Sequence, residues 1–246
     1  MLPPAPTHPD LVAAAQRLRG HLVCCPVIGD LCLPGLTVPP DLRLKAELLQ
    51  PGGSLWFRGA QHWLLRQLGR CKGLACAGDG TMVAAFARAA HAHRLPMVAL
   101  LPQVPTDALR GALEAAECAV RVGVADARQL LTRGPFAGFS PAPAADEPDF
   151  VLGVATVVQE LAEELPAGTE RLLVAPAALA PAVALGVTML RLAWQVEAAP
   201  RDHPQGADVA RALREQHRLC TEGEGAAAVA LALARGLGDT CVLLGV

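Results

Sequence analysis

Short apolar runs alternate along this chain with longer segments that have helical periodicity. The apolar runs have the length of buried strands and occupy residues 42–48, 73–77, 96–101, 119–124, 171–175 and 240–244. The segments with helical periodicity lie between them, at residues 9–21, 57–68, 81–93, 106–116, 125–131 and 150–165. This alternation is typical of α/β proteins, so the sequence predicts an α/β fold with mainly parallel sheets.

The composition indicates a folded chain that binds neither nucleic acid nor a membrane. Hydrophobic residues make up 52% of the 246 residues and charged residues 18%, which argues against disorder. The net charge is −2 and the basic residues do not cluster, so we expect no nucleic-acid partner. Residues 172–190 carry no charge, but Pro176, Pro181 and Gly186 interrupt them, so we expect a strand, loop and helix instead of a membrane span. Residues 1–10 contain neither a basic leader nor an apolar signal core, and we expect a cytoplasmic protein.

The cysteine and histidine residues give no metal-binding pattern. The eight cysteines include the adjacent Cys24 and Cys25, and none has the paired spacing of a zinc site, so we expect buried, reduced thiols. His91 and His93 lie two residues apart at the end of a predicted helix, a spacing that does not place two side chains on one face. We therefore expect no bound metal.

The segment 45–60 carries the most specific pattern in the chain. It reads Lys-Ala-Glu-Leu-Leu-Gln-Pro-Gly-Gly-Ser-Leu-Trp-Phe-Arg-Gly-Ala. It resembles the cofactor-anchoring segment of the fold-type-II pyridoxal-phosphate enzymes, the family of threonine and serine dehydratases, serine racemase and the tryptophan synthase beta chain. The family pattern is Leu-Lys-x-Glu, then Pro-Thr-Gly-Ser-Phe-Lys-x-Arg-Gly-Ala, in which the second lysine forms the Schiff base with the cofactor. Here that position is Trp56, whose indole nitrogen donates a hydrogen bond but has no lone pair for attack on an aldehyde.

Several other segments resemble the same family. Residues 101–110, 119–122 and 146–156 match in order, and residues 221–228, Thr-Glu-Gly-Glu-Gly-Ala-Ala-Ala, resemble the family's Glu-Gly-Ala-Gly-Ala-Ala-Ala. The resemblance implies a two-lobed architecture with the ligand in the cleft between the lobes.

The lobe boundaries follow from the same resemblance. We expect a shortened larger lobe from residues 1–67 and 146–246, and a smaller inserted lobe from residues 68–145. The segment 134–148, rich in Pro, Ala and Gly, is the expected crossing between them. Where the family continues into Ser-Gly-Gly-Asn, this chain ends, so we expect a form truncated at the C-terminus.

Two loops that hold the ligand in the family are altered here. Residues 76–81, Cys-Ala-Gly-Asp-Gly-Thr, stand at the family's Ser-x-Gly-Asn-His, where Asp79 would repel both a phenolate and a carboxylate. The start of the following helix still favours anions, so a residual anion or ligand site is expected at Gly78, Asp79, Gly80 and Thr81, with a plain structural turn as the alternative. The four glycines of the family's phosphate loop are replaced by Ala177, Ala178, Leu179 and Ala180, whose side chains block a close approach of phosphate.

Trp56 has two interpretations. In the first, the indole packs into the space that the lysine and the cofactor occupy in the family. In the second, it is a stacking platform for a planar ligand. The only lysines, Lys45 and Lys72, do not occupy the anchor's position, and we expect both to face solvent or an edge. We also expect solvated helix faces at Glu160, Glu163, Glu164, Arg211, Arg214 and Arg218.

These losses predict a non-catalytic relative of the dehydratases with no bound cofactor. The expected role is structural or regulatory, through association with itself or with an active dehydratase-like paralogue. One alternative is a sensor that binds an amino acid or an anion in the residual cleft. Another is residual serine or threonine ammonia-lyase activity, with pyridoxal phosphate held without the lysine.

Overall fold

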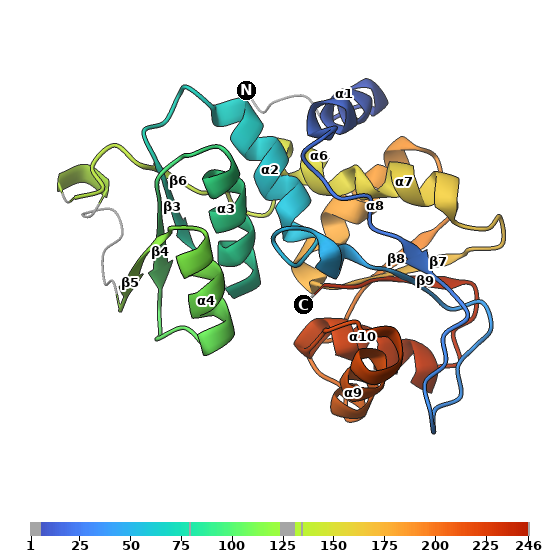
Figure 1. The fold of residues 1–246 in the computed structure, drawn as a ribbon. Helices are drawn as coiled ribbons and strands as arrows, with labels where there is room; N and C mark the ends of the chain where they lie inside the picture. Colours follow the sequence, from blue (N-terminus) through green and yellow to red (C-terminus); the bar gives the residue numbers. More distant parts are fainter. Residues whose placement is uncertain (1–5, 79, 124–130, 134, 246) are drawn as a thin grey trace.

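Two separate β-sheets organise the chain, whose computed structural model describes residues 6–78, 80–123, 131–133 and 135–245 (Figure 1). The five-stranded sheet has the order β1 (Val27–Ile28), β2 (Arg43–Lys45), β9 (Thr240–Leu243), β7 (Arg171–Val174), β8 (Gln195–Ala198). The four-stranded sheet has the order β5 (Ala119–Val122), β4 (Met97–Leu101), β3 (Leu74–Ala77), β6 (Ser140–Pro141). Strand pairs in the described residues are parallel except β1 with β2, which confirms the predicted α/β fold with mainly parallel sheets.

The strands of the two sheets come from different parts of the chain. All four strands of the smaller sheet lie within residues 68–145, and all five strands of the larger sheet lie outside that range. This is the arrangement of a lobe inserted into another lobe. The boundaries at residues 67 and 146 themselves stay a prediction.

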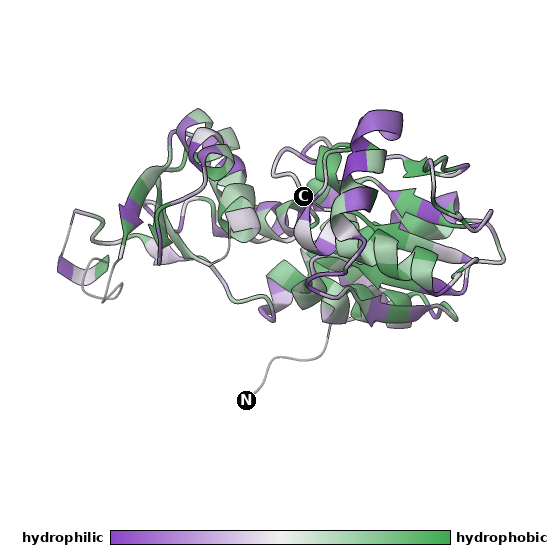
Figure 2. Cartoon of the chain, turned by 90° about the horizontal axis from the view of Figure 1, so that it is seen from below, coloured by the Kyte–Doolittle hydropathy of each residue, from purple (hydrophilic) through white to green (hydrophobic). Residues whose placement is uncertain are grey.

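Helices cover the larger sheet on both faces. On one face lie α6 (Pro148–Ala155), α7 (Val157–Glu164) and α8 (Ala180–Met189), and on the other lie α9 (Gly206–His217) and α10 (Gly223–Ala234) (Figure 1). The buried side chains of β7 alternate between these faces, because Leu172 and Val174 pack with the first set while Leu173 packs with the second. A parallel sheet buried on both faces needs apolar strands, and the neighbouring strands β7 and β9 are buried along almost their whole length. Figure 2 shows hydrophobic residues both in the strands and in the helices.

Helix α2 (Trp56–Gln67) connects the two halves of the molecule. It packs against α6 and against α3 (Gly80–Ala92), which with α4 (Asp107–Ala115) belongs to the smaller lobe (Figure 1). Glycines allow α2 and α6 to approach closely, since a Cβ atom on Gly153 would lie 2.6 Å from the carbonyl oxygen of Arg58. The N-terminal α1 (His8–Leu18) lies on α6 and contributes Leu11 to a small cluster with Leu152.

Three local predictions were wrong in detail. The expected helix at 150–165 is divided into α6 and α7 at Thr156, whose hydroxyl donates to the carbonyl oxygen of Gly153 at 2.6 Å. The strand predicted at 42–48 ends at Lys45 and is followed by the 3₁₀ helix η1 (Glu47–Leu49). The expected crossing at 134–148 contains β6, which pairs with β3 at the sheet edge, where Pro141 is tolerated. The helix expected at 125–131 falls mostly outside the described residues.

Residues 172–190 form the predicted strand, loop and helix, namely β7, the 3₁₀ helix η2 (Ala177–Leu179) and α8. Within the described part of the chain, no helix combines the length and the apolar character needed to cross a membrane.

The cysteines are free thiols, but the expectation that they are buried holds only in part. Cys25, Cys76 and Cys241 are buried, whereas three others are exposed: Cys24, Cys32 and Cys220. Burial raises the pKa of Cys25 and of Cys241 to about 12, so these two thiols stay protonated and unreactive at neutral pH.

Candidate functional site

A cleft of about 1060 Å³ opens between two walls of described residues. One wall comes from the larger lobe and includes Pro51 to Gly53, Pro176 and the segment 222–224. The other wall comes from the start of α3, the loop after β4 and one face of α4. The cleft lies at the carboxyl ends of parallel strands, which is where α/β folds bind ligands. Of the two predicted ligand loops, only the turn before α3 lines it, because the four residues predicted at the phosphate loop are not among the lining residues: Ala177, Ala178, Leu179 and Ala180.

Most of the predicted anion-binding turn lines this cleft. Gly78, Gly80 and Thr81 are among the lining residues, and Asp79 lies outside the described residues. The turn is closely packed: a Cβ atom on Gly78 would lie 2.8 Å from the sulfur of Met82, and one on Gly80 would lie 3.2 Å from the side chain of Leu109, so either substitution would require these side chains to move. The start of α3 therefore opens on the cleft, while the predicted effect of Asp79 stays a prediction.

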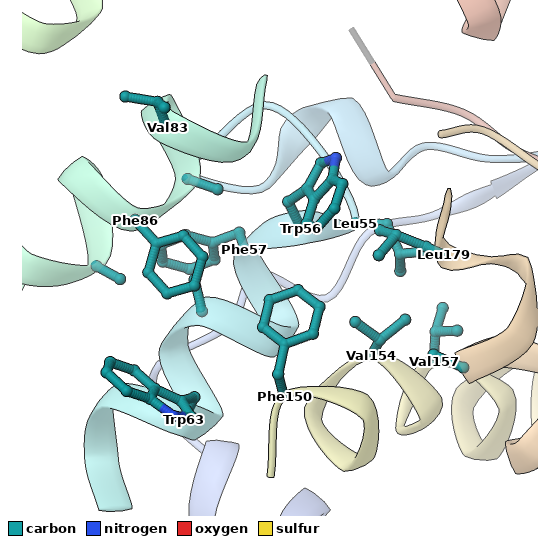
Figure 3. Close-up of a cluster of buried hydrophobic side chains, with 14 of the residues drawn as sticks. Leu55, Trp56, Phe57, Trp63, Val83, Phe86, Phe150, Val154, Val157 and Leu179 are labelled. Carbon is teal, nitrogen blue, oxygen red and sulfur yellow. The ribbon is translucent and has the colours of Figure 1, made fainter. Parts of the chain in front are cut away.

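Trp56 is the first residue of α2 and lies in the core. It is 3% exposed, and its ring centroid is 5.5 Å from that of Phe150, which in turn stacks on Phe86 at 6.0 Å (Figure 3). Trp56 is not among the residues that line the cleft. This agrees with the packed interpretation and gives no support to the stacking platform. The indole N–H of Trp56 and the hydroxyl of Ser54 are both buried without a hydrogen-bond partner among the described residues.

Lys45 does not face solvent, so that expectation was wrong. Its side chain is 0% exposed, and its ammonium lies 2.7 Å from Glu164 and 3.0 Å from Glu160. Arg58, also 0% exposed, donates to Glu160 at 2.7 Å and to buried Glu47 at 2.7 Å. The solvated face predicted at Glu160 and Glu164 holds only in part: Glu164 is exposed and Glu160 is half-buried, but both carboxylates pair with buried cations.

This buried ion-pair network keeps Lys45 protonated. Burial alone lowers the pKa of Lys45, but the hydrogen bond to Glu164 and the charge of Glu160 outweigh it and raise the pKa above its ordinary value. Burial likewise raises the pKa of Glu160, but hydrogen bonding to Arg58 and the charges of both cations lower it overall. A protonated, ion-paired ammonium has no lone pair with which to attack an aldehyde.

Lys72 is exposed and lies before β3, whereas Gly78 at the cleft follows that strand. Six residues of extended chain separate them by about 20 Å. Neither lysine therefore brings an amine to the cleft.

The residues predicted to stand at the family's phosphate loop are helical. Ala177 to Leu179 form η2, and Ala180 begins α8, with the side chain of Leu179 fully buried. The backbone N–H of Ala177 donates to a carboxylate oxygen of Glu224 at 2.6 Å. Glu224 was not among the predicted site residues, although the sequence carried a signal, since residue 224 is a glutamate where the family pattern has alanine.

The residues of this cleft do not fit pyridoxal phosphate. The aldehyde meets no available amine, the space at the anchor is packed with indole, and a loop N–H that would face the phosphate already binds a carboxylate. Cations for a ligand are few as well: the charged side chains among the described lining residues are Arg88, Glu222 and Glu224. Among the same part of the chain, no group of three His, Cys, Asp or Glu side chains is arranged to hold a metal ion.

Comparisons with known proteins agree at the level of fold. No family model matches the chain, and no match was found among curated proteins. The fold is similar to that of a pyridoxal 5'-phosphate-dependent aspartate racemase, with a TM-score of 0.81, 17% identity, and a match covering 99% of this chain and 97% of that chain. A serine racemase from Dictyostelium discoideum gives a TM-score of 0.79 at 15% identity, covering 97% of each chain.

A threonine deaminase from T.th. gives a TM-score of 0.76 at 21% identity, also covering 97% of each chain. At such low identities the similarity shows the fold alone. It confirms the two-lobed, fold-type-II pyridoxal-phosphate-enzyme architecture that the segment 45–60 implied.

Proposed function

We propose that this chain is a non-catalytic protein on the fold of pyridoxal-phosphate enzymes and that it binds a small molecule in the cleft between its lobes. One observation carries the proposal: Trp56 is buried at the sequence position where the family has its reactive lysine, while a cleft of about 1060 Å³ is present between the lobes. The chemistry is thus removed without removing the space for a ligand.

The size and lining of the cleft support binding. Small-molecule sites commonly measure about 300–1,000 Å³ and combine apolar walls with a few polar groups. Here Ala108, Leu109 and Ala112 of α4 provide an apolar wall, and Arg88 of α3 provides a positive charge. An amino acid or a small carboxylate has the charge to pair with this guanidinium.

Thermal unfolding in the presence of ligands tests the proposal. A ligand that binds only the folded protein increases the free energy of unfolding by RT ln(1 + [L]/Kd) and therefore raises Tm. We expect at least one member of a panel of amino acids and small carboxylates to raise Tm in a saturable way, and the shift to be lost in Arg88→Ala. A panel that leaves Tm unchanged throughout contradicts the proposed function.

Residual ammonia-lyase activity is the alternative that the fold itself suggests, because the named structural neighbours include a threonine deaminase. It requires cofactor binding without a lysine anchor. Release of ammonia from serine or threonine that depends on added pyridoxal phosphate would support it against the non-catalytic proposal.

Association with a second copy or with an active paralogue stays a prediction. The large apolar side chains that are exposed in the described chain come from separate segments: Val23, Leu49, Leu68, Val104 and Val122. Size-exclusion chromatography with light scattering, alone and with an active dehydratase, tests it.

A further inference from the structure

Glu224 forms a contact that connects two distant segments across the wall of the cleft. It lies in the first turn of α10, and its Oε2 accepts a hydrogen bond from the backbone N–H of Ala177 at 2.6 Å. Glu224 and Pro176, the residue before Ala177, both line the cleft. The carboxylate therefore occupies the position in which an anion bound to this loop would sit.

The loop favours a negative charge. Ala177 begins η2, which continues directly into the ten-residue helix α8, so the loop lies at the positive end of the helix dipole. A hydrogen bond to a charged acceptor is roughly twice as strong as a neutral one. The Ala177 N–H thus has a strong partner from within the chain.

The start of α10 is held so that Glu224 keeps this position. The hydroxyl of Thr221 donates to the carbonyl oxygen of Gly245 at 2.6 Å, and a Cβ atom on Gly225 would lie 2.5 Å from that same oxygen. Only glycine fits at residue 225 without displacing the segment. Glu224 is therefore carried on a backbone that is packed immediately before and after it.

We propose that Glu224 is an intramolecular anion that occupies the anion-binding loop at the start of α8 and excludes external phosphate from it. The contact replaces what a bound phosphate group does for such a loop: it satisfies the N–H and ties the loop to α10. This inference concerns α8 and α10 and does not depend on which ligand the cleft binds.

The test is thermal unfolding of the full chain and of three variants in inorganic phosphate, with sodium chloride at equal ionic strength as the salt control. Glu224→Ala removes the carboxylate and Glu224→Gln keeps an acceptor without the charge. Glu215→Ala is the matched control, since Glu215 is exposed on α9 and is not among the residues that line the cleft.

We expect Glu224→Ala to lower Tm by about 2–6 °C in sodium chloride, because a charge-assisted hydrogen bond is lost. Phosphate should restore Tm of this variant by about 2 °C or more in a saturable way, since the loop N–H is then open to it. Glu224→Gln should lose less, and the full chain and Glu215→Ala should respond to phosphate no more than to chloride.

Two results would overturn the inference. The first is a saturable phosphate shift in the unaltered chain, which would mean that the loop is open while Glu224 is present. The second is a Glu224→Ala variant that is folded by circular dichroism yet shows no phosphate effect beyond that of chloride. Glu224→Gln keeps the test valid if the alanine variant does not fold, because it must then show the partial loss of Tm and a phosphate shift.

Discussion

Replacing Trp56 tests whether the indole is a core residue, and the expected magnitude follows from its surroundings. The side chain is 3% exposed and packs on Phe150. Burying a tryptophan removes about 200 Å² from water, and truncating such a residue to alanine costs about 3–5 kcal/mol. The buried indole N–H has no acceptor, however, and removing an unsatisfied group returns about 1–3 kcal/mol. With the middle of each range, Trp56→Ala should therefore lower the free energy of unfolding by about 2 kcal/mol.

Trp56→Phe sharpens the prediction. Phenylalanine keeps most of the aromatic contact with Phe150 and removes the unpartnered N–H, so the two effects oppose each other. We expect this variant to unfold within about 1 kcal/mol of the unaltered chain.

Urea unfolding followed by circular dichroism measures both variants, with Trp194→Phe, a half-buried position, as a control for tryptophan loss. A Trp56→Ala variant within about 0.5 kcal/mol of the parent would refute the packing argument. A Trp56→Phe variant as unstable as Trp56→Ala would show instead that the indole N–H has an important partner.

Three further predictions concern other parts of the chain. Glu160→Gln should lower the free energy of unfolding by about 2–3 kcal/mol, because Lys45 and Arg58 lose a shared counter-charge. The control Glu163→Gln on the same helix should change the free energy of unfolding by under about 0.5 kcal/mol. Equal effects of the two substitutions would contradict the ion-pair network. Burial lowers the pKa of His62, whose Nε2 accepts from Arg17 and whose Nδ1 donates to a backbone carbonyl, so the unfolded chain binds a proton more readily. The contribution of His62 to stability should be complete above pH 6.5 and decline as pH falls below that value. The urea midpoint should therefore fall between pH 7.5 and 5, and it should fall less in His62→Gln. An equal fall in the two proteins would contradict this prediction. Brief alkylation of the folded protein should modify the three exposed thiols first: Cys24, Cys32 and Cys220. Peptide mass spectrometry should find the buried Cys25 and Cys241 modified only later. Early labelling of either buried thiol would show that the packing around it opens.

The sequence predicted the elements whose signal is local. Apolar runs and helical periodicity were enough for β3, α3 and β4, and the Gly78 to Gly80 turn was placed at the start of a helix that lines the cleft. Thr156 interrupts a helix through a hydroxyl bond that periodicity does not detect. Strand β6 forms only because β3 offers an open edge to a proline-rich segment.

The buried charged residues were not predicted, because their partners are distant in the sequence. Lys45 and Glu160 lie 115 positions apart in the chain, and nothing local to either indicates that they meet. Glu224 differs in this respect, because its departure from the family pattern was visible. Only its contact with Ala177, 47 residues away, shows what the change does.

The most direct test of the central claim is whether the purified protein captures the aldehyde of pyridoxal phosphate. The protein is incubated with stoichiometric cofactor, reduced with borohydride and mapped by peptide mass spectrometry, with Lys72→Arg as a control for surface labelling. We predict no visible absorbance band beyond that of the free cofactor and no pyridoxyl adduct on Lys45. Any trace of label at Lys72 should be absent from the Lys72→Arg control. A stoichiometric adduct on Lys45, or a saturable visible band that persists in Lys72→Arg, would contradict the account.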